Sequence, residues 1–320
     1  MSIASIPDAM SSSSSTTPKP RDQDIDIHGL THPGNVREAN QDHFLISSLR
    51  REVTVHLSSL PQHEHWTQGE RLALLAVVAD GVGSSVSSEN ASRLAVEHVM
   101  AYVLEAMNCY YRMNEADDGK LVEAMRDAAL RVHGEIQQAR ADEPVEGRGM
   151  ATTLTLWLGV WPRAFLLQVG DSRCYIFKDD RLTQLSRDQT MAEEMARIGA
   201  LKRDDIQRSP LSNILSSALG GQEATPVITR VDQSWGTVGL LCSDGLTKHV
   251  TDEQIAARLR DMTSAKQVCE QLLQDALDGG GTDNITIVVG RPVQPWSDGA
   301  GSGGLDDLHA SKEPTAPRPA

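Results

Sequence analysis

The sequence of 320 residues lacks the features that define several broad classes of protein. Its longest apolar runs, such as Leu72–Ala79, are far shorter than the roughly 20 residues that a membrane-spanning helix requires. With a formal net charge of −14, it has no basic patch that could neutralise nucleic-acid phosphates. Its N-terminal region contains Ser11–Ser15 but no apolar segment typical of a secretory signal. We therefore expect a cytoplasmic protein without a membrane span and without a nucleic-acid partner.

Cysteine is scarce as well. The four cysteines, Cys109, Cys174, Cys242 and Cys269, are scattered and form no CxxC pair. This spacing indicates neither a disulfide framework nor a zinc site, so each cysteine is expected to be a reduced residue of the core. The sequence also lacks a nucleotide-binding motif and an obvious serine nucleophile motif.

What is present fits one globular domain with two extensions. The 39% hydrophobic and 23% charged residues are ordinary for a soluble protein. Residues 1–24 contain a Ser/Thr/Pro tract, and residues 292–320 are rich in Gly and Pro. We predict both extensions to be disordered and residues 25–291 to form a single catalytic domain.

Five aspartates stand at the ends of predicted strands. Asp80, Asp171 and Asp244 follow apolar runs, whereas Asp42 and Asp283 precede them. In an antiparallel sheet, the end of one strand lies beside the start of its neighbour. The sequence therefore predicts that all five carboxylates gather at one edge.

Clustered carboxylates repel each other unless cations neutralise them. Mg²⁺ and Mn²⁺ prefer carboxylate, carbonyl and water oxygens, which are the ligands that this set offers. Arg37 lies close in sequence to Asp42 and has two interpretations. It could grip phosphate oxygens through two parallel hydrogen bonds, or it could form a structural ion pair with a nearby aspartate.

The remaining pattern predicts an α+β fold with antiparallel sheets. Apolar periodicity indicates helices over Ser88–Tyr111 and Lys120–Arg140, and Thr251 with Gln254 forms a capping-box pattern at the start of another. Strands and helices alternate in groups and not in a regular βαβ rhythm. An irregular insert over Met191–Leu219 is expected to act as a flap over the substrate.

Seven motifs occur along the domain, and their order is RxxNQD (Arg37–Asp42), ADGVG (Ala79–Gly83), GMATT (Gly149–Thr153), GDSR (Gly170–Arg173), LSRDQT (Leu185–Thr190), LCSDGL (Leu241–Leu246) and GGTDNITIVV (Gly280–Val289). Together they resemble the metal-dependent serine/threonine protein phosphatases of the PPM family, type 2C, in its bacterial form. The resemblance covers residues 25–289. It implies a four-layer α-β-β-α sandwich: two antiparallel sheets flanked by helix pairs, with metals in a cleft at one end.

The resemblance also implies roles for single residues. Asp80 would bridge two Mn²⁺ or Mg²⁺ ions, with Asp244 and Asp283 on one ion and the Gly81 carbonyl on the other. Asp42 would hold metal-bound water, and Arg37 would bind the substrate phosphate. In similar bacterial members a third ion lies near the residues that match Asp171 and Asp244.

The expected reaction is hydrolysis of phosphoserine or phosphothreonine by direct attack of a metal-bridging water. Two positions depart from the family pattern: Val82 stands where animal members often have a His that protonates the leaving group, and Gln41 stands where a Glu is common. Two other hypotheses remain: a catalytically silent regulatory module of the same fold, and a phosphoesterase acting on small molecules. The expected partners are phosphoproteins of a cognate Ser/Thr kinase, and the expected state is a monomer.

Overall fold

The computed structural model describes residues 18–51, 70–83, 86–107, 118–142 and 150–293. Most of the two predicted extensions, and Cys109, therefore lie outside the described residues. Residues 18–24, which we assigned to the N-terminal extension, are described and lie against the domain. Within them Asp22–Asp24 form a 3-10 helix, capped by an ion pair between Asp24 and Arg21.

The strands and helices follow each other in mixed groups. In chain order they are β1 (Ile25–His32), β2 (Asp42–Arg51), β3 (Glu70–Asp80), α1 (Val86–Met107), α2 (Asp118–Asp142), β4 (Leu154–Val160), β5 (Arg163–Val169), β6 (Arg173–Lys178), β7 (Arg181–Gln184), α3 (Met191–Arg197), a 3-10 helix (Arg203–Asp205), β8 (Val227–Asp232), β9 (Val238–Cys242), α4 (Asp244–Thr247), α5 (Asp252–Arg260), α6 (Ala265–Asp278) and β10 (Ile285–Pro292).

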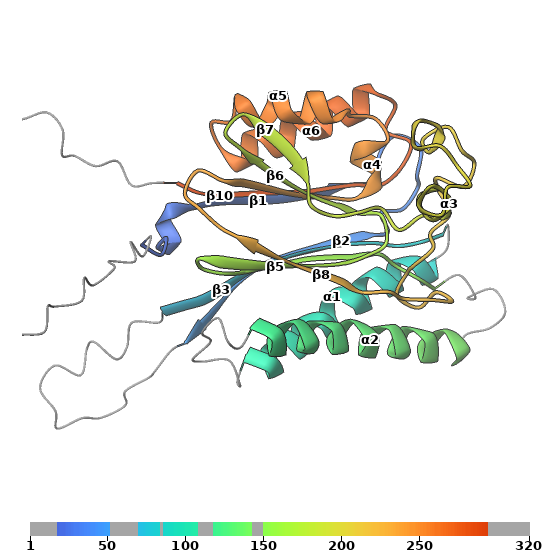
Figure 1. Ribbon diagram of the computed structural model, residues 1–320, viewed down its shortest axis with the longest axis horizontal. Coiled ribbons are helices and arrows are strands. Elements are labelled where there is room, and N and C mark those ends of the chain that lie inside the picture. The colour runs from blue at the N-terminus through green and yellow to red at the C-terminus, as the bar shows by residue number, and fades with distance from the viewer. Residues whose placement is uncertain (1–17, 52–69, 84–85, 108–117, 143–149, 294–320) are drawn as a thin grey trace, which may run out of the picture.

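The strands form two five-stranded sheets in which every neighbouring pair is antiparallel. The order is β1-β10-β9-β6-β7 in one sheet and β2-β3-β4-β5-β8 in the other. Figure 1 shows the sheets stacked face to face, with α5 and α6 on one outer side and α1 and α2 on the other. The predicted α-β-β-α sandwich of antiparallel sheets is confirmed.

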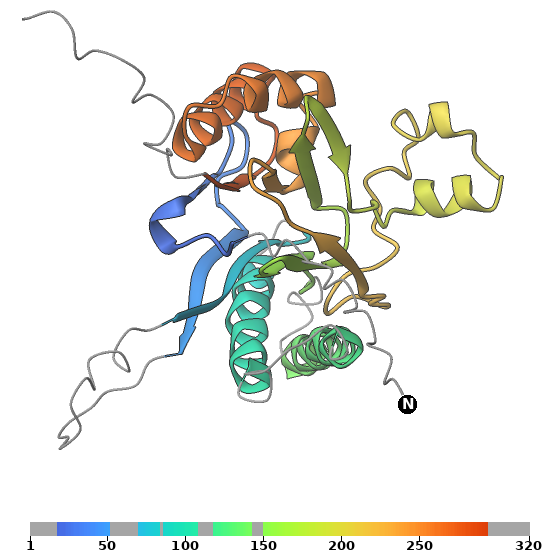
Figure 2. The same ribbon diagram turned by 60° about the vertical axis from the view of Figure 1, so that its left-hand side comes forward.

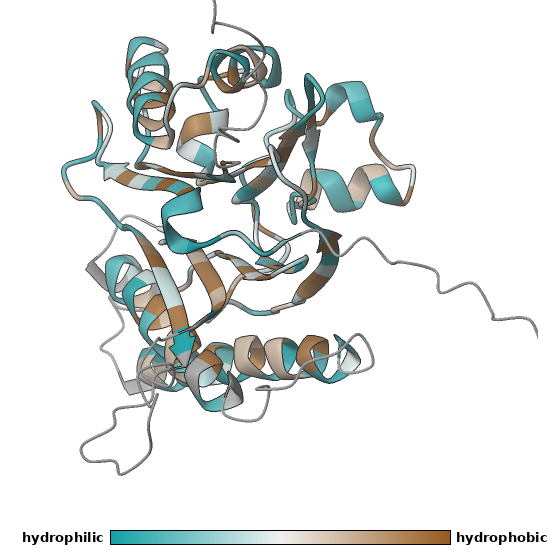
Figure 3. Ribbon diagram, turned by 90° about the vertical axis from the view of Figure 1, so that its left-hand side faces the viewer, coloured by the Kyte–Doolittle hydropathy of each residue, from teal (hydrophilic) through white to brown (hydrophobic). Residues whose placement is uncertain are grey.

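Three apolar layers hold this sandwich together. The first packs α1 and α2 on one sheet, the second packs α5 and α6 on the other, and the third lies between the sheets. Figure 3 shows the same division, because hydrophobic residues concentrate on the strands and the outer helix faces are hydrophilic. Burial of apolar area is the main favourable term in folding, and it fixes the strands whose ends carry the aspartates.

Local signals set the helix boundaries. Thr251 accepts a hydrogen bond from Gln254 N, and the Gln254 side chain returns one to Thr251 N, so the predicted capping box is confirmed. At the end of α6 the backbone φ of Gly281 is +53°, a left-handed conformation that glycine adopts without steric cost. This turn ends the helix and leads the chain into Asp283.

The insert between β7 and β8 differs from the rest of the domain. It contains α3, the short 3-10 helix and several turns, and Figure 2 shows it standing away from the sandwich. The strand after it, β8, was missing from our predictions. Its residues are all exposed or only partly buried because it is the edge strand of its sheet, so its apolar pattern is weak.

No helix in the described ranges is both long enough and apolar enough to cross a membrane.

Candidate metal centre

The structure brings the five predicted aspartates to one end of the sandwich. Asp42 is the first residue of β2 and Asp80 the last of β3, and the two face each other across the antiparallel pair. Asp244 follows β9, Asp283 precedes β10, and Asp171 follows β5. Antiparallel pairing places Asp42 beside Asp80, and the packing of the two sheets brings Asp244 and Asp283 from the other sheet to the same end. Residues up to 241 positions apart in sequence therefore share one site.

Hydroxyl side chains fix the Asp80 backbone. Thr152 Oγ1 donates to the Asp80 carbonyl at 2.8 Å, and Asp80 N donates to Thr153 Oγ1 at 3.0 Å. Thr153 Oγ1 in turn lies 2.8 Å from Ser172 Oγ, beside Asp171. The GMATT and GDSR motifs thus meet behind Asp80. A Cβ on neighbouring Gly81 would stand 2.6 Å from the Ser88 carbonyl oxygen, so only glycine fits there.

Burial and mutual repulsion act on the carboxylates. Burial raises the pKa of Asp80 well above its usual value, and the charges of Asp42, Asp244, Asp171 and Asp283 add to the shift. Burial, with the charges of Asp244 and Asp188, raises the pKa of Asp171 to about 8. Burial likewise raises the pKa of Asp42 to about 6 and that of Asp244 above its usual value. The cluster therefore concentrates negative charge that favours a cation.

Asp42 presents one oxygen without a partner. Its Oδ2 accepts hydrogen bonds from Ser243 Oγ and Thr286 Oγ1, both at 2.7 Å. Its Oδ1 is buried and has no hydrogen-bond partner among the described residues. A buried carboxylate oxygen in this state is costly, and it calls for a water or an ion.

Two basic side chains reach into the cluster. Lys248 Nζ lies 2.6 Å from Asp244 Oδ2 and 2.7 Å from Asp283 Oδ2, and Arg37 Nε lies 2.8 Å from Asp283 Oδ1. Burial acts to raise the pKa of Asp283, but the hydrogen bonds from Arg37 and Lys248 outweigh it and leave that pKa below its usual value. The ion pair that we considered for Arg37 is therefore present.

Lys248 was missing from the predicted site. It lies four residues after Asp244, and α4 places the two side chains on one face. That spacing was the available signal in the sequence. Its second contact, with Asp283, depends on how α4 packs beside the start of β10 and has no sequence signature.

Asn284 ties the Arg37 loop to the cluster. Its Oδ1 accepts from Gln41 N at 2.9 Å, and its Nδ2 donates to the carbonyls of Pro33 and Ala39 at 3.0 and 2.9 Å. One buried amide thus holds both ends of the loop that carries Arg37. The NQD and TDN motifs are joined in this way.

An ion pair between Arg173 and Asp188 joins the GDSR and LSRDQT motifs on the other side of the cluster. Arg173 Nη2 donates to Asp188 Oδ2 at 2.7 Å, and Arg173 Nε reaches both carboxylate oxygens of Asp188. Arg173 follows Asp171, whereas Asp188 leads into the insert. This pair fixes the position at which the insert leaves the domain.

The donors at this end fit hard divalent cations. They are buried carboxylate oxygens and a backbone carbonyl, one oxygen lacks a partner, and two side-chain cations already neutralise Asp244 and Asp283. Among the residues that the structure describes, no three Asp, Glu, His or Cys side chains stand as a closed metal cage. The Lys248 ammonium instead occupies the position between Asp244 and Asp283.

The sequence matches the family model described as protein phosphatase 2C over residues 62–279. The chain therefore belongs to the protein phosphatase 2C family, as its motifs suggested.

Relatives and solved structures agree with this assignment. Serine/threonine protein phosphatase PstP of Mycobacterium tuberculosis is 32% identical over 243 residues, which are 74% of this chain and 45% of PstP. The chain thus spans less than half the length of that relative. Serine/threonine phosphatase stp of Listeria welshimeri is 29% identical over 67% of this chain and 83% of its own length.

The crystal structure of the Mycobacterium tuberculosis phosphatase PstP/Ppp superposes with a TM-score of 0.67 and 27% identity, covering 84% of this chain and 99% of that one. A structure of a PstP catalytic domain in complex with two manganese ions gives a TM-score of 0.62 at 27% identity, covering 84% of this chain and 99% of that one.

Proposed function

We propose that this protein is a metal-dependent serine/threonine protein phosphatase that hydrolyses phosphoserine and phosphothreonine. The observation that carries the proposal is the convergence of five aspartates from two sheets at one end of the sandwich beside Arg37, in a chain of the protein phosphatase 2C family. The two manganese ions in the related PstP structure support a dinuclear Mn²⁺ or Mg²⁺ centre here.

The proposed roles follow the positions of the side chains. Asp80 has a central place among the carboxylates and would bind both cations. Asp244 and Asp283 would be further ligands of one cation, and the Gly81 carbonyl would be a ligand of the other. The charge of Asp171 contributes to the raised pKa of Asp80, and the charge of Asp244 contributes to the raised pKa of Asp171. Asp171 is therefore the proposed ligand of a third ion.

When bound, such cations polarise the phosphoryl group and lower the pKa of water enough to provide a nucleophile near neutral pH.

The chain itself would orient the reactants. Asp42 Oδ1 has no hydrogen-bond partner in the part of the chain that the structure describes, and it would accept a hydrogen bond from the attacking water. Ser243 and Thr286 hold the other oxygen of that carboxylate. Arg37 would exchange part of its pairing with Asp283 for the phosphate oxygens of the substrate, since a guanidinium matches both groups in the same planar geometry. The loop held by Asn284 would keep Arg37 in reach during that exchange.

Partners and location are also proposals. A protein phosphatase needs a kinase that makes its substrates, so we propose a cognate Ser/Thr kinase as its counterpart. Such a kinase uses cytoplasmic ATP, which favours action in the cytoplasm. The three described cysteines, Cys174, Cys242 and Cys269, carry free thiols and are compatible with that compartment. We propose a monomer, which light scattering on the purified protein would test.

The decisive experiment measures phosphate release from a phosphothreonine peptide by the full chain with Mn²⁺, with Mg²⁺ and with chelator. We expect turnover with metal, none with chelator, and none in Asp80→Asn. A folded protein that is silent with every metal would contradict the proposal and favour a regulatory module. Turnover of nucleoside monophosphates but not of phosphopeptides would contradict the protein substrate and favour a small-molecule phosphoesterase.

A further inference from the structure

A groove of about 1170 Å³ lies between the insert and the sandwich, and it begins beside the proposed metal centre. Val82, the residue that follows the Gly81 carbonyl, lines this groove together with Met191 of α3 and Val227 of β8. A polypeptide whose phosphorylated residue lies at the proposed metal centre can therefore continue directly into the groove.

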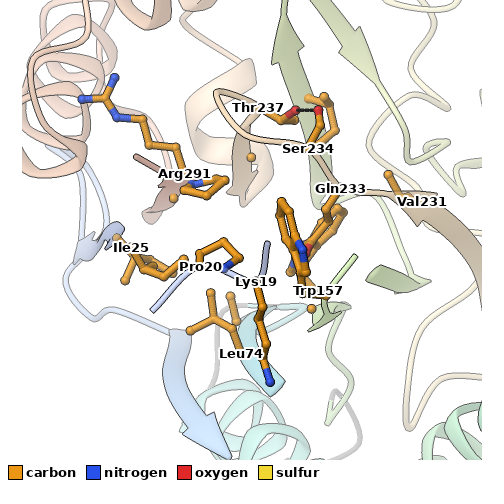
Figure 4. Close-up of a pocket in the computed structure, with 18 of the residues that line it drawn as sticks. Lys19, Pro20, Ile25, Leu74, Trp157, Val231, Gln233, Ser234, Thr237 and Arg291 are labelled. Carbon is orange, nitrogen blue, oxygen red and sulfur yellow. Dashed lines mark hydrogen bonds between the residues drawn. The ribbon is translucent and has the colours of Figure 1, made fainter. Parts of the chain in front are cut away.

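The apolar space at the other end of the sandwich has no such connection. It measures about 90 Å³, and Leu74 and Trp157 are among the residues that line it (Figure 4). It borders the first half of β3, whereas Asp80 is the last residue of that strand. None of the residues that line it belongs to the proposed metal centre. A chain bound at the aspartates therefore adjoins the groove and not this space.

Exposed apolar side chains gather in the groove. Seven large apolar side chains are exposed in the described residues, and Met191, Ile214 and Val227 are three of them. All three line the groove. Single exposed apolar residues are ordinary, but a group of them on one surface marks a site of contact with another molecule. The groove therefore suits the aliphatic parts of a bound polypeptide.

A turn that starts at Ala218 and ends at Glu223, which we call the groove turn, forms one wall of the groove. Gly81 lies opposite Thr152, and Thr152 lies opposite Leu219, in two antiparallel bridges. Because neighbouring strands stand about 4.8 Å apart, the Leu219 backbone lies about 10 Å from that of Gly81. Glu223 is one step further away, since its carbonyl accepts a hydrogen bond from Ala218 N at 2.9 Å.

Helix α2 holds the groove turn in place. His133 Nδ1 accepts a hydrogen bond from Gly220 N at 3.0 Å, and Arg140 Nη1 donates to the Gly220 carbonyl at 3.2 Å. Gln137 Nε2 donates to the Gly221 carbonyl at 2.9 Å. The backbone φ of Gly220 is +75°, and a Cβ there would clash with an α2 side chain, so only glycine allows this close approach. These contacts fix the turn relative to the proposed metal centre.

Glu223 carries the one charge in the groove that has no partner among the described residues. The four other charged side chains that line the groove all form ion pairs. These pairs are Arg187 with Glu193, Asp188 with Arg173, and Glu194 with Arg197. Glu223 is exposed, and its carboxylate has neither an ion pair nor a hydrogen bond in the described part of the chain. A carboxylate that a fixed turn holds in this way complements a lysine or arginine of a bound chain.

We propose that the groove binds the polypeptide that flanks the phosphorylated residue, and that Glu223 selects substrates with a lysine or arginine near that residue. The proposal rests on the proposed phosphatase function and names a substrate class for it. An extended chain advances about 3.3 Å per residue, and about 15 Å separates the backbones of Gly81 and Glu223. The basic residue should therefore lie within about four positions of the phosphorylated one.

The test compares phosphothreonine peptides that differ at one position. In a neutral parent peptide, alanine is replaced by a single Arg or a single Glu at each position up to about four residues on either side of the phosphothreonine. With Mn²⁺ present, we expect Arg at one or two neighbouring positions to raise kcat/KM about fivefold, and Glu at the same positions to lower it by a similar factor. Because salt screens exposed charges, the preference should be mostly lost in about 0.5 M NaCl.

Charge variants assign the preference to one side chain. Glu223→Gln should remove the preference, and Glu223→Arg should reverse it, so that the Glu peptide becomes the better substrate. Glu123→Arg is the matched control, because Glu123 is an exposed residue near the start of α2, whereas the groove turn contacts the second half of that helix. It changes the net charge by the same amount and should leave the preference unchanged. Thermal melting confirms that each variant is folded.

A substrate without a peptide chain separates this proposal from the proposed function. Hydrolysis of para-nitrophenyl phosphate with Mn²⁺ depends on the metal centre and not on the groove. If neither this compound nor any peptide is hydrolysed, the phosphatase function fails and the selection by Glu223 fails with it. If both are hydrolysed but the Arg, Ala and Glu peptides have equal kcat/KM, the phosphatase function holds and the role of Glu223 is overturned. A preference that Glu223→Arg leaves unchanged overturns that role as well.

Discussion

The two ends of the sandwich are built on the same strands but have opposite chemistry. At one end β3, β9 and β10 meet aspartates, and burial and repulsion raise the pKa of Asp80 and Asp244. At the other end all three strands carry apolar residues around an open space, which Gly239 of β9 and Gly290 of β10 also line. The first end has charge that a cation would neutralise, and the second has a mostly apolar space of about 90 Å³. The apolar layer between the sheets separates the two.

This comparison predicts that variants at the charged end change metal chemistry, while variants at the apolar end change stability. The largest effect is expected for Asp244→Asn, which removes a proposed ligand. Turnover of a phosphothreonine peptide with Mn²⁺ should fall at least about 1000-fold.

The same variant removes one of several carboxylate charges that repel each other. In the presence of chelator, its midpoint of thermal unfolding should therefore rise by about 2–4 °C. Activity close to that of the parent would show that Asp244 is not a ligand.

The next effect is expected at the opposite end. Trp157→Ala leaves a large void between the sheets and should lower the free energy of unfolding by about 3–5 kcal/mol in urea denaturation. The Mn²⁺ concentration that gives half-maximal turnover should stay the same, because the tryptophan lies far along the strands from the aspartates. Trp157→Phe is the matched control and should cost much less. A shift of the metal dependence would break the separation between the ends.

Arg37 tests whether its ion pair with Asp283 is only structural. Arg37→Ala should raise KM for a phosphopeptide about 10–100-fold and lower kcat less, because a charged contact to phosphate is lost. Arg37→Lys should recover part of the loss, since Lys lacks the planar pair of donors. Arg93→Ala, which removes an exposed pair with Glu97, is the control. An unchanged KM in Arg37→Ala would favour the purely structural interpretation.

The smallest effect concerns the ammonium between Asp244 and Asp283. Lys248→Met removes a positive charge that repels a divalent cation and competes with it for Asp244 and Asp283. The substitution should therefore tighten Mn²⁺ binding about tenfold. Isothermal titration with Mn²⁺ measures this directly, without reference to turnover. Lys266→Met, at an exposed pair with Glu270, should leave the affinity unchanged. Weaker binding in Lys248→Met would mean that the lysine positions the ligands and does not compete for them.

Much of this architecture was predictable because it depends on local patterns. The helices predicted to start at Ser88 and Lys120 start within two residues of those positions, at Val86 and Asp118. Antiparallel pairing accounts for the neighbourhood of aspartates within each sheet, whereas the meeting of the two groups depends on the packing of the two sheets. The features that escaped prediction depend on contacts between distant segments. Lys248 meets Asp283 only through the packing of α4.

The space between the sheets, at the end opposite the aspartates, was equally invisible in the sequence. Gly159, Gly239 and Gly290 belong to three strands, and their shared position depends on how the two sheets pack. Edge strand β8 was missed because packing on one side only leaves it with a weak apolar pattern.

The insert between β7 and β8 has one more consequence. The chain leaves one sheet at edge strand β7 and enters the other at edge strand β8, so the insert joins two edges and passes through neither sheet. A change in the length of its exposed part would therefore alter no strand register, whereas Leu219 near its end packs in the apolar layer below α1 and α2. Evolution can lengthen, shorten or rewrite this segment while the aspartate cluster stays intact.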